Sequence, residues 1–336
     1  MTGEDLMKAS QLLKRIGVGM IACYCSFLVG CANQNQEEIK KIGVLQYTEH
    51  AALDSSYEGF MAALEDNGYV DGENIKIDFK NAQGEMPTTQ TIANQFVNDQ
   101  VDMIFAIATP AAQAAYNATK DIPIVFTAVT DPIESGLANS WEASGTNVTG
   151  TSDLTPVAKQ MALIKDILPD AKKIGVLYTT SEVNSEIQVE LAESVAKDLG
   201  LEIVRVGITT VNDIPNAIAS VVDKVDVIYS PTDNLVSSAM PVVWDACVDK
   251  KIPVFAGEEA MVKTGGIATE GIDYYQLGYE TGLMAIEVLE GKDPSTMPIN
   301  TLENTTLIVN QENADAINLT IPEEILNQSE IVTNNE

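Results

Sequence analysis

The sequence is poor in histidine, cysteine and basic residues. Its 336 residues include one histidine, four cysteines and 19 lysines and arginines, against 49 aspartates and glutamates. One histidine and no paired cysteines leave only scattered carboxylates as metal ligands, so we expect no metal site. The formal net charge of −30 disfavours a nucleic-acid partner, because binding to phosphate backbones requires clustered Lys and Arg.

A hydrophobic stretch long enough to span a bilayer is also missing. Lys8, Lys14 and Arg15 precede an apolar run at 16–30, which is shorter than the ~18–20 residues of a stable spanning helix. This pattern predicts a signal peptide over residues 1–30. The run ends in Leu-Val-Gly-Cys, which resembles the lipobox of bacterial lipoproteins and implies that Cys31 receives lipid and becomes the mature N-terminus.

Residues 31–38 are polar and without periodicity, and we interpret them as a tether. The protein is then anchored by lipid to the outer face of the cell membrane and does not cross it. With Cys31 lipidated and the signal peptide removed, Cys247 is the one cysteine left, so no intramolecular disulfide can form.

Catalysis finds no support in the residue patterns. His50 has no Ser or Cys nucleophile at a recognisable spacing, and Cys247 lies in an apolar helical run where it is typical of a small core residue. A Walker-type phosphate loop is absent from the sequence. We therefore expect a binding protein without a cofactor, not an enzyme.

What the sequence does contain is an internal repeat. Three apolar blocks recur in the same order in the two halves of the chain: Lys-Lys-Ile-Gly-Val-Leu at 40–45 and 172–177, Val-Asp-Met-Ile-Phe at 101–105 with Val-Asp-Val-Ile-Tyr at 225–229, and Ile-Pro-Ile-Val-Phe at 122–126 with Ile-Pro-Val-Phe at 252–255. Apolar strands that alternate with helical segments are typical of parallel sheets covered by helices on both faces. The repeat therefore predicts two similar Rossmann-like α/β lobes.

The same patterns predict where the elements and domains lie. In the first half we expect strands at 42–46, 75–79, 101–107 and 122–128, a short strand at 146–150, and a helix from Asp54 or Ser55 to residue 67. Near the end we expect a strand at 265–269, a helix at 275–289, a strand at 306–310 and a helix at 322–327. The predicted domains are lobe one at 39–151 and 272–304, lobe two at 152–271 and 305–329, and a disordered tail at 330–336, with hinge crossings near 150–153, 271–273 and 303–305.

Four motifs connect this layout to a known family. They are Ile-Ala-Thr-Pro-Ala-Ala-Gln at 107–113, Phe-Thr-Ala-Val-Thr-Asp-Pro at 126–132, Asn-Val-Thr-Gly at 147–150 and Ser-Pro-Thr-Asp-Asn at 230–234. With them, the mature chain resembles the tryptophan- and tyrosine-binding branch of ABC-transporter substrate-binding lipoproteins, which has the type I periplasmic-binding-protein fold. The resemblance implies a monomer that closes on one small ligand and delivers it to the permease and ATPase subunits of an importer. A receptor for another zwitterion or a nucleoside, and a surface sensor or adhesin, remain alternatives.

A ligand would sit where the strands of both lobes end, because open α/β sheets bind ligands beyond the carboxyl ends of their strands. In lobe one, we expect Thr109 to cap a helix that starts at Pro110, so that the amides of Ala111 and Ala112 can bind a carboxylate. In lobe two, Asp233 occupies the place of Ala112 and is predicted to bind an ammonium group. Asp131 and Glu258 are the alternative partners for that group.

Aromatic residues favour an aromatic amino acid, tryptophan or tyrosine, as the ligand. Tyr47 and Tyr178 end their strands in matching positions and could enclose an aromatic ring between them. His50 is either a ligand contact or an ordinary loop residue. The further candidate contacts in these loops are Leu53, Asp54, Thr127, Ala128, Ser181, Asn184, Thr232 and Asn234.

Overall fold

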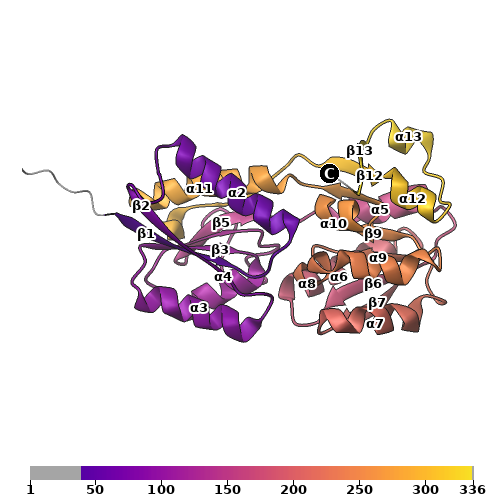
Figure 1. Ribbon diagram of the computed structural model, residues 1–336, viewed down its shortest axis with the longest axis horizontal. Helices are drawn as coiled ribbons and strands as arrows, with labels where there is room; N and C mark the ends of the chain where they lie inside the picture. The colour runs from indigo at the N-terminus through magenta and orange to yellow at the C-terminus, as the bar shows by residue number, and fades with distance from the viewer. Residues whose placement is uncertain (1–38, 335–336) are drawn as a thin grey trace, which may run out of the picture. The chain divides into compact units, whose positions relative to one another are not determined.

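The computed structural model describes residues 39–334, which form alternating strands and helices (Figure 1). Two parallel sheets, of six and four strands, and a smaller sheet of three strands organise these residues. Within the described range, no helix is both long and apolar enough to cross a membrane. The predicted signal peptide, tether and lipidated Cys31 lie outside the described residues.

The six-stranded sheet defines what we call lobe one. Its strand order is β11-β5-β4-β3-β1-β2 and all of its pairings are parallel. The strands are β1 (Lys40–Gln46), β2 (Ile75–Asn81), β3 (Met103–Ile107), β4 (Ile124–Thr127), β5 (Val148–Ser152) and β11 (Ile299–Thr301). The helices are α2 (Ala51–Asp66), α3 (Met86–Asn98), α4 (Thr109–Ala118) and α11 (Tyr274–Leu289). Figure 1 shows α2 and α11 on one face of the sheet and α3 and α4 on the other, which buries β3, β4 and β5 along their whole length.

The other two sheets define lobe two. The parallel sheet β7-β6-β8-β9 consists of β6 (Lys173–Thr179), β7 (Glu202–Ile208), β8 (Val227–Ser230) and β9 (Val254–Ala256). The small sheet consists of β10 (Ala268–Gly271), β12 (Thr306–Asn310) and β13 (Glu330–Val332). The helices are α5 (Val157–Ile167), α6 (Val183–Ala196), α7 (Ile214–Val221), α8 (Asn234–Ser238), α9 (Met240–Val248), α10 (Glu259–Thr264), α12 (Gln311–Ala316) and α13 (Glu323–Leu326).

The repeated sequence blocks form equivalent parts of the two lobes. Lys-Lys-Ile-Gly-Val-Leu supplies the inner strands β1 and β6. The Asp of the second block accepts a backbone hydrogen bond at the start of each of these strands: Asp102 from the N–H of Lys41, and Asp226 from the N–H of Lys173, both at 2.8 Å. The repeat therefore encodes a strand together with the carboxylate that caps its first free N–H group.

The glycine inside the repeat is required by packing. A Cβ atom on Gly43 would lie 2.6 Å from the ring of Phe96, and one on Gly175 would lie 2.8 Å from the Cδ1 atom of Ile228. Such short separations would force the core side chains apart, so each lobe needs a residue without a side chain at this point.

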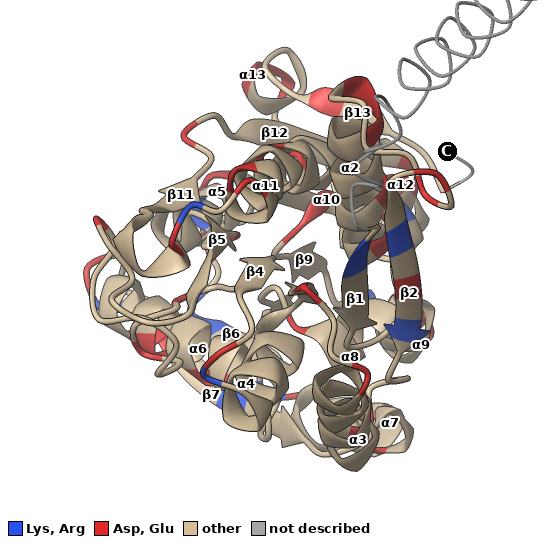
Figure 2. Cartoon of the chain, turned by 90° about the vertical axis from the view of Figure 1, so that its left-hand side faces the viewer, with Lys and Arg blue, Asp and Glu red and all other residues tan. Residues whose placement is uncertain are grey.

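Charged residues differ in distribution according to sign. In the view of Figure 2, Asp and Glu are spread over many elements, whereas Lys and Arg occur in short separate segments, including parts of β1 and β2. Several basic side chains pair with neighbouring acids, for example Arg205 with Glu193 at 2.7 Å.

Three sequence-based expectations about the fold are wrong. Residue 265 ends α10 as its C-cap, and the strand begins only at Ala268, where β10 pairs antiparallel with β12. The tail at 330–336 was expected to be disordered, but β13 pairs with β12 and buries Val332. Helix α2 starts at Ala51, so neither Asp54 nor Ser55 is its N-cap.

The chain passes between the lobes at three places, as the sequence predicted. These connections are residues 153–156 between β5 and α5, 272–273 between β10 and α11, and 302–305 between β11 and β12. The short strand β11, which the sequence patterns did not reveal, lies between the second and third crossings and completes the edge of the lobe-one sheet.

Candidate ligand-binding site

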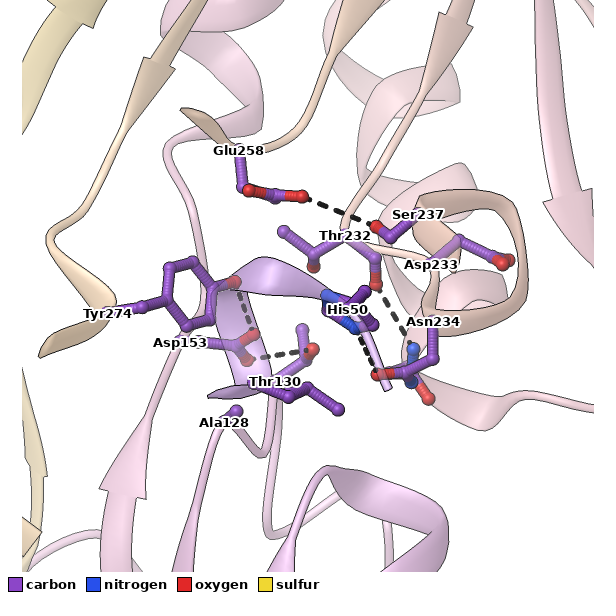
Figure 3. Close-up of a pocket in the computed structure, with 12 residues that line it drawn as sticks. His50, Ala128, Thr130, Asp153, Thr232, Asp233, Asn234, Ser237, Glu258 and Tyr274 are labelled. Atoms are coloured by element: carbon purple, nitrogen blue, oxygen red, sulfur yellow. Dashed lines mark hydrogen bonds between the residues drawn. The ribbon is translucent and has the colours of Figure 1, made fainter. Parts of the chain in front are cut away.

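A polar cavity lies where loops of both lobes meet (Figure 3). Its accessible volume is about 10 Å³, room for about one water molecule in the described arrangement. Lobe one contributes His50, Leu53, Ala128, Thr130 and Tyr274, the first crossing contributes Asp153, and lobe two contributes Asn184, Thr232, Asp233, Asn234, Ser237 and Glu258.

The strand ends position most of these side chains. Ala128 and Thr130 follow β4, Asp153 follows β5 directly, and Thr232 follows β8. Because the carboxyl ends of parallel strands lie at one edge of a sheet, residues far apart in sequence meet there.

Two alanines beside the cavity adopt strained backbone conformations. Ala108, after β3, has φ = 82°, and Ala128, after β4, has φ = 56°. A positive φ is unfavourable for a residue with a Cβ atom, and such strain of about 1–3 kcal/mol is found most often at ligand sites. This strain is a reason to consider this edge of the lobe-one sheet as the candidate site.

Asp153, at the start of the first crossing, is a buried acid that lines the cavity. Its Oδ1 accepts a hydrogen bond from the Thr130 hydroxyl at 3.1 Å, and its Oδ2 accepts one from the Tyr274 hydroxyl at 2.8 Å (Figure 3). Burial raises the pKa of Asp153, and no Lys or Arg is among the residues that line the cavity. These bonds leave part of the accepting capacity of the carboxylate unused, so the group can accept a hydrogen bond from a cationic ligand group.

Glu258 is the buried acid that lobe two presents to the same cavity. It caps α10, since its Oε2 accepts from the N–H of Ala260 at 2.6 Å and its Oε1 from the N–H of Met261 at 3.2 Å. Burial raises its pKa to about 7. Much of the hydrogen-bonding capacity of Glu258 is therefore used to hold a helix in place.

Glu258→Gln should flatten the pH dependence of the free energy of unfolding of the ligand-free protein. Burial raises the pKa of Glu258 from 4.5 to about 7, so the folded state holds this proton more tightly than the unfolded state. The resulting stability, on the order of 3 kcal/mol, is present below pH 4.5 and is lost as the pH rises toward 7. Urea unfolding of the wild-type and Glu258→Gln proteins at pH 4.5 and pH 8 gives the change in the free energy of unfolding between the two pH values. Equal changes for the two proteins would contradict the assignment.

Asp233 lines the cavity, but its carboxylate serves the interior of lobe two. Its oxygens accept from the N–H and hydroxyl of Thr179 at 2.6 and 2.8 Å, from the Ser185 hydroxyl at 2.7 Å and from the N–H of Val236 at 2.9 Å. These four donors occupy the lone pairs of the carboxylate. This arrangement leaves no lone pair for the ammonium group that we predicted Asp233 to bind.

Asp131 is a turn residue. Its Oδ1 accepts from the N–H groups of Ile133 at 2.9 Å and Glu134 at 3.0 Å, and it is not among the residues that line the cavity. Of the three acids considered from the sequence for the ammonium group, only Glu258 both lines the cavity and remains available.

The start of α4 differs in detail from the prediction. Ala108 is the N-cap and Thr109 is the first helical residue, while the N–H of Ala112 donates to the carbonyl of Ala108 at 3.1 Å and is not free. The hydroxyl of Thr109 is buried without a hydrogen-bond partner. Because the N–H of Ala108 donates to the carbonyl of Thr127 at 3.1 Å, this helix start lies directly beside the loop that carries Ala128.

The two tyrosines do not form the expected enclosure for a ring. The Tyr47 hydroxyl donates to the carbonyl of Gly84 at 2.9 Å, and Tyr178 packs in the core of lobe two. Neither lines the cavity. Tyr47 belongs to the core of lobe one and Tyr178 to that of lobe two, so their matching sequence positions do not place them together at the cavity.

All the residues predicted for the site divide into two groups. Those that line the cavity are His50, Leu53, Ala128, Asn184, Thr232, Asp233, Asn234 and Glu258. Those that do not are Tyr47, Asp54, Thr109, Pro110, Ala111, Ala112, Thr127, Asp131, Tyr178 and Ser181. Asp54 instead accepts from Gln46 at 2.6 Å, the Thr127 hydroxyl lies 3.2 Å from that of Thr151, and Ser181 is exposed.

Sequence reasoning missed four lining residues: Thr130, Asp153, Ser237 and Tyr274. Asp153 and Tyr274 lie at or beside the predicted crossings, for which the sequence indicated hinge motion and not ligand contacts. The sequence position of Asp153 could have identified it, because it directly follows a buried strand, and the other loops of the site also follow strands.

Comparisons with known proteins show the family of the chain. Residues 41–333 match the model of the ABC transporter substrate binding protein family. The chain is 49% identical over 326 residues to a tyrosine-binding protein of Clostridioides difficile (strain R20291), covering 94% of each chain.

Solved structures give the same result. An ABC domain from Streptococcus pneumonia in complex with L-Trp has a TM-score of 0.85 at 38% identity, covering 88% of this chain and 100% of that one. A ligand-free, open structure of a substrate-binding protein with adhesive properties from Clostridium difficile has a TM-score of 0.67 at 50% identity, with the same coverage. A Bacillus halodurans solute-binding protein with bound myo-inositol, at 15% identity and a TM-score of 0.59 over 85% of this chain and 100% of that one, supports the fold alone. These similarities confirm the type I periplasmic-binding-protein fold.

Proposed function

Because the chain belongs to the family of ABC transporter substrate-binding proteins, which bind ligands and are not enzymes, we propose that it binds an aromatic L-amino acid, tyrosine or tryptophan, in the cavity between its lobes. The observation that carries the proposal is Asp153, a buried acid facing a cavity whose lining residues include no Lys or Arg. The tyrosine-binding relative and the L-Trp complex support the choice of amino acid.

Each end of the amino-acid backbone has a partner in this proposal. The ammonium group binds Asp153, beside the hydroxyls of Thr130 and Tyr274. The carboxylate binds at the start of α4, which does not itself line the cavity but lies beside the loop of the cavity residue Ala128. There the Thr109 hydroxyl is buried without a partner among the described residues, and the amides of Thr109 and Ala111 have no acceptor within the helix. The aromatic side chain then packs against Leu53 and the ring of Tyr274.

Closure of the lobes accompanies binding in this proposal. The structure is more similar to the L-Trp complex than to the ligand-free, open relative, although its sequence is more similar to the latter. The described arrangement thus corresponds to a closed state. We propose that domains 39–151 with 272–304 and 152–271 with 305–329 move about the crossings at 153–156, 272–273 and 302–305.

Calorimetry with amino acids and truncated analogues tests the function. We expect tyrosine or tryptophan to bind, and tyramine and tryptamine, which lack the carboxylate, to bind ~10- to 100-fold more weakly, because each charge-assisted hydrogen bond contributes about 1.5–3 kcal/mol. Equal affinity for tyramine and tyrosine would contradict the carboxylate site at Thr109. No binding of any aromatic amino acid would contradict the proposed function itself.

The lipid anchor and delivery to an importer complete the proposal. Proteins of this family act outside the cytoplasm, and the lipobox ending at Cys31 provides the attachment site. Cys31→Ala should release the protein from membranes or leave its signal peptide uncleaved, as measured by membrane fractionation and intact-mass spectrometry. A variant that stays membrane-bound at the mature mass would contradict the anchor.

A further inference from the structure

A chain of hydrogen bonds crosses the cavity from His50 in lobe one to Glu182 in lobe two. The Nε2 atom of His50 lies 3.4 Å from the Oδ1 atom of Asn234 (Figure 3), and the Nδ2 atom of Asn234 donates to Glu182 Oε2 at 2.5 Å. Glu182 also accepts from the Nδ2 atom of Asn184 at 3.1 Å and from the N–H of Leu235 at 3.2 Å. Its neighbours in this network are all N–H donors, so Glu182 acts as the acceptor.

This chain determines which nitrogen of His50 carries the proton. Because Asn234 turns its amino group toward Glu182, its carbonyl oxygen faces His50, and Nε2 must be the N–H donor. Burial lowers the pKa of His50 to about 4, so the ring is neutral near pH 7 and has a single N–H group. The Nδ1 atom is therefore a hydrogen-bond acceptor.

The acceptor has no partner among residues 39–334. His50 is the N-cap residue of α2, but its side chain makes no capping hydrogen bond, and Nδ1 is buried without a partner. A buried acceptor is unfavourable unless a donor reaches it. Because His50 lines the cavity, a ligand can supply that donor.

We propose that Nδ1 of His50 is the specificity-determining acceptor for the ligand side chain. It accepts a hydrogen bond from the phenolic O–H of tyrosine or the indole N–H of tryptophan. Phenylalanine has no donor, so it would leave Nδ1 buried and unpaired, and a site built around a hydrogen bond discriminates strongly against a ligand that lacks it. This inference rests on the proposed function and adds to it the reason for preferring aromatic rings that carry a donor.

The first experiment compares ligands on the wild-type protein. We expect tyrosine and tryptophan to bind ~10- to 100-fold more tightly than phenylalanine in calorimetry near pH 7. Equal affinities for tyrosine and phenylalanine would overturn the inference and leave the proposed function standing. No binding of any of the three would instead refute the proposed function.

The second experiment assigns the preference to His50. His50→Phe keeps a ring at this position and removes both nitrogens, so it should reduce the tyrosine-to-phenylalanine affinity ratio to near one while phenylalanine still binds. Asp131→Asn is the control, because Asp131 accepts backbone hydrogen bonds within a turn and does not line the cavity, so this change should leave the ratio unchanged. A His50→Phe protein that keeps the wild-type ratio overturns the inference. Should this variant fail to fold in a thermal melt, the ligand comparison on the wild type still decides.

Discussion

Asp153→Asn should weaken binding of tyrosine or tryptophan by ~10- to 100-fold. The substitution keeps the size of the side chain but removes the buried negative charge that faces the ligand ammonium group. The hydroxyls of Thr130 and Tyr274, at 3.1 and 2.8 Å, orient this carboxylate, and no basic side chain among the cavity-lining residues competes for it. Calorimetry of the purified variant, with a thermal melt to verify folding, measures the effect.

Asp131→Asn is the matched control for this prediction. Asp131 also lies just beyond the end of a lobe-one strand, but its carboxylate accepts backbone hydrogen bonds within a turn and does not line the cavity. The Asp131→Asn protein should bind the ligand with the wild-type affinity. If Asp153→Asn binds normally and Glu258→Gln does not, the ammonium group belongs to Glu258 and the assignment to Asp153 is wrong.

Asp233→Ala should reduce the free energy of unfolding of the ligand-free protein by at least about 3 kcal/mol. The carboxylate connects β6, α6 and the start of α8 through hydrogen bonds from Thr179, Ser185 and Val236. Its removal leaves these buried donors without an acceptor, and each unsatisfied donor costs about 1–3 kcal/mol. Urea unfolding followed by circular dichroism measures the loss.

Asp273→Ala provides the comparison, because Asp273 is an exposed N-cap that accepts one hydrogen bond, from Gln276 at 3.0 Å. We expect this variant to lose only about 0.5–2 kcal/mol. Should the two variants lose the same small amount, the buried network around Asp233 would not be the structural support that its contacts indicate.

Much of the fold follows from sequence because its signals are local. A parallel strand covered on both faces must be apolar throughout, so β1 and β6 appear as repeated apolar blocks. Strand β11 was not predicted, because its three residues, Ile299–Thr301, are too few to show a pattern. Antiparallel pairing of β10 with β12 depends on a partner about forty residues away, which no local pattern encodes.

For the site, the sequence located the loops but not the directions of their side chains. Asp233 was assigned to the ligand because it occupies the position of Ala112 in the repeat, yet its carboxylate turns toward Thr179 and Ser185, 54 and 48 residues earlier in the chain. The repeat preserves the path of the backbone, while the neighbours of each side chain are set by packing within its own lobe.

The sequence by itself determined that this protein has two similar α/β lobes joined by three crossings, with loops gathered at the strand ends, because hydrophobic periodicity and chain direction are enough to specify these features. Only the tertiary structure decided which polar groups are left to serve a ligand. The roles that we propose for Asp153, Tyr274 and the Nδ1 atom of His50 rest on their burial and on the hydrogen bonds that their neighbours already make. Such properties depend on contacts between residues more than a hundred positions apart, and these contacts exist only once the chain has folded.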